Sequence, residues 1–100
     1  MKIFVSNSAY SDLEDIEEYY RKEGVAHIGK QLIEAIIEHA QVLLDNPDIG
    51  RIVPEFGEEQ IRELIHSPFR VVYLRGPNSI HIIRVWRSER MLRLPDEGVT

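Results

Sequence analysis

The spacing of apolar residues changes along the chain, from a helical rhythm in the first half to a strand rhythm in the second. Residues 2–6 form a short β-prone run that ends where Asn7 and Ser8 supply turn and helix-capping side chains. From Ala9 onward, apolar residues recur every three or four positions, which is the spacing of one face of an α-helix. They are Ala9, Leu13, Ile16 and Tyr20. Acidic residues lie between them and basic ones in the last turn, so this helix should end near Gly24.

A second, longer helix is predicted over residues 25–45, because two adjacent apolar rows run through this segment. The rows are Ile28, Leu32, Ala35, Ile36 and Leu43, and Ile33, Ile37, Ala40 and Leu44. Pro47 disfavours helical geometry at Asn46, so the helix should stop there. Since only a glycine-centred turn separates the two helices, they should form an antiparallel hairpin.

Three strands are predicted after a loop at residues 50–57, which contains two glycines and one proline. They span residues 61–65, 69–75 and 79–87, with Pro68 closing the first connection and a tight turn at 76–78 forming the second. The sequence therefore predicts an α+β fold: a strand, an antiparallel helix hairpin, and a three-stranded antiparallel meander. Together they should form a small, mostly antiparallel sheet with both helices on one face.

Both faces of the last two strands are apolar, although alternate residues of a strand point to opposite sides. Phe69, Val71 and Tyr73 should share one face, and Arg70, Val72 and Leu74 the other; likewise Ile83 and Val85 should oppose Ile80, Ile82 and Trp86. Two helices can cover only one face of such a sheet. The second face should therefore bind a partner, unless the 50–57 loop and the tail at 91–100 fold over it.

The chain length of 100 residues fits a single domain at residues 1–100, with a short C-terminal tail at 91–100. Apolar residues make up 43% and charged residues 29%, as in folded soluble proteins. The chain has no cysteine, which excludes disulfides and thiolate chemistry. Residues 1–6 are too polar for a signal peptide, and no apolar run approaches the ~20 residues that span a bilayer. We therefore expect a cytoplasmic protein without membrane contact.

The net charge of −5 conceals an uneven distribution. Residues 1–50 hold four basic and ten acidic residues, giving −6, whereas residues 51–100 hold eight and seven, giving +1. Between residues 60 and 94, seven arginines accompany two glutamates, a local charge of +5. These arginines either pair with acidic side chains of the same chain or contact an anionic partner.

Five short segments, taken in order, resemble the ParE/RelE toxin superfamily of type II toxin-antitoxin systems. The resemblance covers nearly the whole chain and is closer to the ParE-like branch. The segments are Ala9 with Asp12, Leu13, Ile16 and Tyr20; Asn46-Pro47 with Gly50-Arg51; Ile61-Arg62-Glu63-Leu64; Phe69-Arg70-Val71-Val72-Tyr73; and residues 82–86 followed by Arg90.

The resemblance implies a toxin that a cognate antitoxin binds and neutralises with its C-terminal segment. ParE-type toxins are associated with inhibition of DNA gyrase, whereas RelE-type toxins cut messenger RNA on the ribosome. Since the antitoxin usually contributes the DNA-binding part, we expect no sequence-specific DNA contact from this chain. A non-enzymatic, gyrase-binding toxin is the favoured interpretation, and a RelE-like endoribonuclease is the alternative. A third interpretation is a degenerate family member that is retained as a binding module or regulator with its partner.

Metal-free RNA cleavage needs a base, an acid and cations around the phosphorane. The resemblance to the nuclease branch would give phosphate-stabilising roles to Arg70 and to Arg87 or Arg90. Arginine cannot act as the base, because its pKa lies above 12. The nuclease branch commonly has a Tyr or His near the C-terminus, but residues 88–94 contain neither, which leaves Glu89 or His81 as substitutes and weakens the enzymatic interpretation.

The remaining candidates are residues for partner binding rather than cofactor binding. The four histidines have no metal-ligand spacing and no cysteine accompanies them, so neither a metal nor another cofactor is expected. Tyr73 and Trp86 favour core positions, but on the partner-facing side Trp86 would be an anchor for the antitoxin. The predicted partner-binding residues are Arg70, Val72, Leu74, Arg84, Trp86, Arg87 and Arg90.

Overall fold

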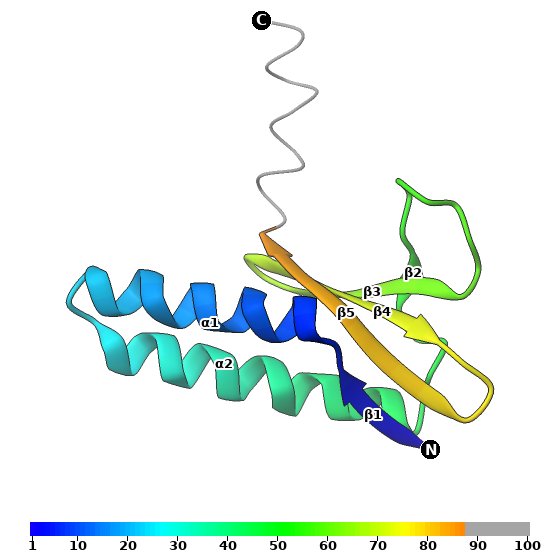
Figure 1. Cartoon of the computed structure of the whole chain (residues 1–100). Helices are drawn as coiled ribbons and strands as arrows, with labels where there is room; N and C mark the ends of the chain where they lie inside the picture. The colour runs from blue at the N-terminus through cyan, green and yellow to red at the C-terminus, as the bar shows by residue number, and fades with distance from the viewer. Residues whose placement is uncertain (88–100) are drawn as a thin grey trace, which may run out of the picture.

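The computed structural model of the chain describes residues 1–87, and it confirms the predicted α+β fold (Figure 1). Its elements are β1 (Lys2–Val5), α1 (Asn7–Lys22), α2 (Ala26–Ala40), the 3-10 helix η1 (Gln41–Leu44), β2 (Arg51–Ile52), β3 (Ile61–His66), β4 (Phe69–Arg75) and β5 (Ser79–Arg87). The predicted tail at 91–100 and the candidate Arg90 lie outside the described residues. No helix within residues 1–87 is long and apolar enough to cross a membrane.

The sheet has five strands in the order β1-β5-β4-β3-β2, with β1 parallel to β5 and the other neighbours antiparallel. The predicted meander is its centre, and β4 and β5 have the predicted bounds. The prediction of a plain loop at residues 50–57 missed β2, whose two residues are too few to show a periodic pattern. The second helix was predicted to extend to residue 45 as a regular α-helix, but α2 ends at Ala40 and a 3-10 turn continues to Leu44.

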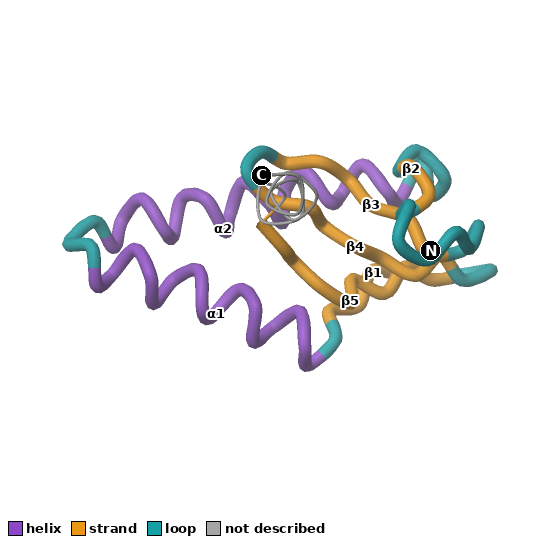
Figure 2. Tube along the Cα trace, turned by 90° about the horizontal axis from the view of Figure 1, so that it is seen from above, coloured by secondary structure: helices purple, strands orange, loops and turns teal. Residues whose placement is uncertain are grey.

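The two helices form the predicted antiparallel hairpin (Figures 1 and 2). Ser6, rather than Asn7 or Ser8, caps α1, since its Oγ accepts a hydrogen bond from the backbone N–H of Ala9 at 3.1 Å. Gly24, with φ of 81°, allows the turn between the helices. Close packing also depends on Gly29, where an added Cβ would lie 2.9 Å from the Cβ of Tyr20.

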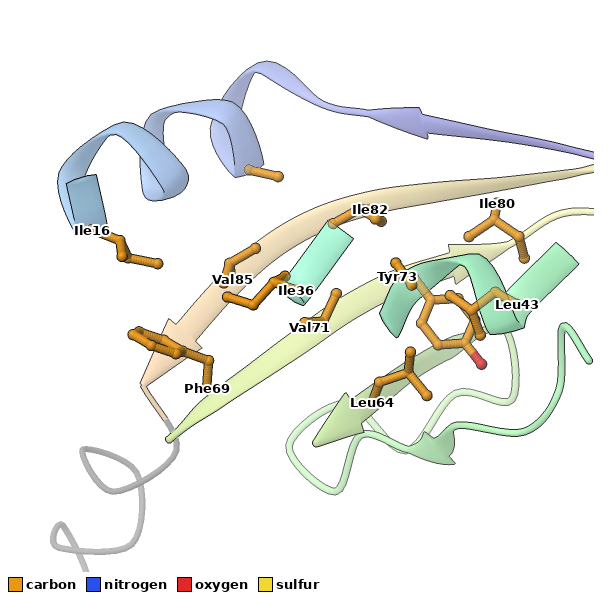
Figure 3. Packing of buried hydrophobic residues seen from close by; sticks show 12 residues of the cluster. Ile16, Ile36, Leu43, Leu64, Phe69, Val71, Tyr73, Ile80, Ile82 and Val85 are labelled. Atoms are coloured by element: carbon orange, nitrogen blue, oxygen red, sulfur yellow. The ribbon is translucent and has the colours of Figure 1, made fainter. Parts of the chain in front are cut away.

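The hydrophobic core lies between the helix hairpin and one face of the sheet (Figure 3). From β4 it receives the predicted face of Phe69, Val71 and Tyr73, each at most 1% exposed. The Tyr73 hydroxyl is bound within the core, because it donates to the Pro47 carbonyl at 2.8 Å and accepts from the Gly50 N–H at 3.0 Å. Burial raises the pKa of Tyr73 above its ordinary value. Tyr73 is therefore a structural residue, as the sequence favoured.

The face assignments of Val85 and Trp86 on β5 were wrong. Trp86, predicted to share a face with Ile80 and Ile82, instead pairs with Arg70 on the face opposite the helices. Ile80 and Ile82 face the helices as a pair, but Val85 joins them in the core instead of pointing to the opposite side. The cause is a β-bulge: Tyr73 pairs with Ile82, whereas the preceding residue of β4 pairs with Arg84, so Ile83 is passed over. The bulged residue is held from outside the pair, since Ser6 Oγ donates to the Ile83 carbonyl at 3.2 Å. Strict alternation of strand residues cannot predict a bulge, which changes the residues of β5 that face the helices.

Candidate interaction surface

Three rows of side chains cross the sheet on the face opposite the helices, since directly paired residues of neighbouring strands share a face. The first row is Phe4, His81, Leu74 and Ile61; the second is Arg51, Glu63, Val72 and Arg84; the third is Ile65, Arg70 and Trp86. The outer rows expose apolar side chains: Phe4 is 47%, Ile65 45% and Leu74 37% accessible. The middle row is rich in charge, which divides this face into two apolar strips.

A buried network of charges occupies the centre of this face. The Glu63 carboxylate, with a side chain 0% exposed, accepts hydrogen bonds from Arg70 Nε at 2.6 Å and Arg51 Nε at 2.5 Å. The terminal nitrogens of Arg70 donate to both carboxylate oxygens of Glu55 at 2.9 Å. The hydrogen bonds that Arg70 donates to Glu55 lower the pKa of Glu55 and raise the pKa of Arg70. This ion pair thus stabilises the ionised forms of Glu55 and Arg70.

The segment that follows β2 covers this network. Val53 and Val72 are both 0% exposed, although neither belongs to the core beneath the helices. Figure 1 shows the segment between β2 and β3 rising from the sheet on the side away from the helices. The sequence left open whether the second face stays bare or the 50–57 loop folds over it. The loop covers the strip around Arg70 and Val72, whereas Leu74 and the other exposed residues of the outer rows remain accessible.

A groove of about 550 Å³ lies between α1 and the C-terminal half of β5. It forms where β1 has ended, and there Asp12 of α1 binds the free edge of β5. The Asp12 carboxylate accepts from the backbone N–H of Val85 at 2.8 Å and from two nitrogens of Arg84 at 2.8 and 2.9 Å. The hydrogen bonds that Arg84 donates to Asp12 raise the pKa of Arg84. The groove is lined by Asp12, Asp15, Ile16, Tyr19, Tyr20, Phe69, Arg84, Val85, Trp86 and Arg87.

Aromatic rings and guanidinium groups meet at the rim of this groove. The guanidinium carbons of Arg84 and Arg70 lie 5.3 and 5.9 Å from the centre of the Trp86 ring, and that of Arg87 lies 5.4 Å from the Phe69 ring. The guanidinium groups of Arg70 and Arg84 contact the Trp86 ring through cation–π interactions. Trp86 is only half-buried, so part of its side chain remains accessible. With Tyr19, which is 53% exposed, it provides large rigid apolar area of the kind that dominates binding interfaces.

Within residues 1–87, five arginines from the second half of the sequence are paired with acidic side chains of the same chain. Arg51, Arg62, Arg70, Arg75 and Arg84 each form an ion pair with an acidic residue of the same chain. The acidic partners come mainly from residues 48–63, and α1 contributes only Asp12 among these pairs. Of the two sequence interpretations, pairing within the chain therefore accounts for these five arginines.

The structure separates the predicted site residues into two groups. Leu74, Arg84, Trp86 and Arg87 reach accessible surface, whereas Arg70 is 3% and Val72 0% exposed. Arg90 falls outside the described residues, as does the substitute base Glu89. Sequence reasoning missed Glu55 and Glu63 as the partners of Arg70, and Asp12 as the partner of Arg84. The excess of arginine was the available signal, but it did not name their carboxylates.

The fold and this surface define a small α+β domain. It has a groove lined by aromatic side chains, and arginines that pair with carboxylates of the same chain. The family model described as the ParE toxin of the type II toxin-antitoxin system, parDE, matches residues 3–92. The chain therefore belongs to the ParE toxin family.

Among solved structures, one chain of the chromosomal ParDE TA system from P. aeruginosa superposes with a TM-score of 0.73. The alignment covers 87% of this chain and 95% of that chain at 21% sequence identity, a level at which it supports the fold alone. A comparison with curated proteins gave no match.

Proposed function

We propose that this ParE-family chain is a toxin that a cognate antitoxin neutralises, and that it inhibits growth by binding DNA gyrase without cleaving RNA. Family membership supports the pairing with an antitoxin. The observation that favours binding over RNA cleavage is that Arg70 is paired with two carboxylates of the same chain. Each of its three guanidinium nitrogens already donates to Glu55 or Glu63, and the residue is 3% exposed, so two carboxylates compete with any phosphate for this guanidinium.

The RelE-like alternative would need an arginine that stabilises the phosphorane and a base that takes the 2′-hydroxyl proton. Arg70 fits this role only if the segment carrying Glu55 moves away. Tyr73 is buried with its hydroxyl bound on both sides, and His81 stacks on Phe4 with ring centres 5.0 Å apart. Within residues 1–87, these positions favour a toxin that acts by binding.

The antitoxin contact is assigned to the α1–β5 groove, with a second contact on the apolar strip that includes Leu74, which lies beyond the charged middle row. One wall of the groove carries Asp12 and Asp15, the other Arg84 and Arg87. A segment with apolar side chains along one side and charges of both signs at its margins complements such a surface. Trp86 is the proposed anchor, because aromatic residues held in half-buried positions contribute most to interface affinity.

Two assays separate the candidate activities. Supercoiling by purified gyrase should fall as the purified chain is added, and unchanged supercoiling at excess toxin would exclude the gyrase proposal. Translation-dependent cleavage of a reporter messenger RNA should not appear. Cleavage that disappears in an Arg87→Gln variant would instead establish the RelE-like activity.

The antitoxin proposal has an independent test. The reading frame beside this one should encode a small protein that binds the chain, and Trp86→Ala should weaken that binding at least about tenfold, as expected for a central anchor. Tyr10→Ala is the matched control, because Tyr10 is 61% exposed on α1 and does not line the groove. Equal affinities of the two variants would exclude Trp86 as the anchor without affecting the gyrase proposal.

A further inference from the structure

Two histidines that are 27 residues apart in the sequence meet at the junction of α2 and β3. His39 lies in the last turn of α2, and His66 is the last residue of β3. Their Nδ1 atoms are 3.0 Å apart, and the ring centres are 5.2 Å apart with the planes tilted by 51°. Both side chains are half-buried, and neither lines the α1–β5 groove. The pair is therefore a separate cluster of metal-ligating groups.

The short separation restricts what can occupy the space between the two rings. Two bare lone pairs would repel at this distance, and two N–H groups would collide, so one positive centre must be shared. A single proton meets this requirement when one imidazole donates to the other. A metal ion that binds both nitrogens meets it as well, provided that both imidazoles are neutral.

We propose that His39 and His66 form a binding site for a late first-row divalent cation such as Ni²⁺ or Cu²⁺. Imidazole nitrogens bind such ions at about 2.1 Å, and two nitrogens 3.0 Å apart then subtend an angle of about 90° at the metal. This is the angle between neighbouring ligands in octahedral and square-planar complexes, whereas tetrahedral zinc requires a wider one. The sequence analysis expected no metal because the four histidines lack ligand spacing; this proposal departs from that expectation, since His39 and His66 come together only in the fold.

The surroundings favour a cation for a second reason. The C-terminal turn of a helix carries partial negative charge, and His39 lies in that turn of α2. Within residues 1–87, no third histidine, cysteine or carboxylate joins the pair to form a group of three. Water would therefore occupy the remaining coordination positions. A cation held in this way links the end of α2 to the end of β3, so it should stabilise the folded chain.

The test uses the full chain without an affinity tag, titrated with NiCl₂ at pH 7.5 by calorimetry and by amide NMR. We expect one equivalent to bind, with signals near residues 39 and 66 shifting or broadening first, and a melting temperature that rises to a plateau. His39→Gln and His66→Gln should each weaken binding at least about tenfold, since one imidazole is lost. His27→Gln and His81→Gln are matched controls and should bind as the parent does.

Three results would overturn the proposal: no binding at millimolar Ni²⁺, perturbation centred on other residues, or undiminished affinity in both His39→Gln and His66→Gln. Amide spectra of the metal-free variants establish that they are folded, and His66→Asn provides a second substitution if His66→Gln is not. A pH series adds a further readout. The Ni²⁺ affinity should fall as the pH decreases, because protons compete with the metal for the same imidazole nitrogens.

Discussion

Replacing Arg70 with methionine removes the cation that lies between Glu55 and Glu63 and leaves a side chain of similar length. The Glu63 carboxylate is 0% exposed, so after the substitution it keeps only Arg51, whose side chain is 61% exposed. Removing one partner of a buried ion pair costs about 3–5 kcal/mol, because an uncompensated charge remains. Since Arg51 still offsets part of this charge, we expect Arg70→Met to lower the free energy of unfolding by about 3 kcal/mol.

Urea unfolding at pH 7, followed by far-ultraviolet circular dichroism, measures this loss. Arg75→Met is the matched control, since Arg75 pairs with Asp48 at 2.9 Å on the surface, where Asp48 is 61% exposed. Such exposed pairs contribute about 0–1 kcal/mol. In the double variant with Glu63→Gln, the buried charge is gone, so at least about half of the loss should be recovered. Equal effects of Arg70→Met and Arg75→Met would refute the reasoning.

Three further predictions concern other contacts. Gly50→Ala should destabilise the chain by about 1–3 kcal/mol in the same urea assay, because an added Cβ would lie 2.6 Å from the Tyr73 hydroxyl; an unchanged unfolding midpoint would contradict this. Asp12→Ala should lower the free energy of unfolding by about 1–3 kcal/mol, since it leaves the β5 edge and Arg84 without their acceptor. Asp12→Asn should lower it by less. Equal decreases for the two variants would show that these hydrogen bonds do not contribute to stability. The pKa of His66 in the folded chain lies below its ordinary value of 6.5. Its contribution to the free energy of unfolding should therefore be present above about pH 6.5 and be lost as the pH falls through the lowered pKa. His66→Gln should remove this part of the pH dependence of unfolding.

Local patterns of the chain were sufficient to predict most of its elements. The four-residue spacing of apolar positions gave the helix hairpin, and the β-rich runs gave β4 and β5 with the bounds they have in the structure. The face of β4 that carries Phe69 and Tyr73 also followed from alternation alone. These features depend on backbone geometry over a few residues, which is why a single sequence reveals them.

The contacts of the candidate surface were decided at longer range. The bulge at Ile83, whose carbonyl accepts a hydrogen bond from Ser6 77 residues away, reverses the face of Val85. Arg84 receives its carboxylate from Asp12 across 72 residues. Neither pairing leaves a periodic trace in the sequence, because it arises only when β1 and α1 close against β5.

The sequence by itself thus determined the order of helices and strands, the apolar faces that must be buried, and a surplus of arginine in the second half. Only the tertiary structure decided that Glu55 and Glu63 neutralise Arg70, and that His39 and His66 stand 3.0 Å apart. The physical reason is the sequence separation between the interacting residues. Hydrophobic periodicity reflects residues that are close together within one helix or strand. The ion pairs and the contact between the two histidines join residues that are distant in sequence, so they form only when the sheet and the helix hairpin are assembled.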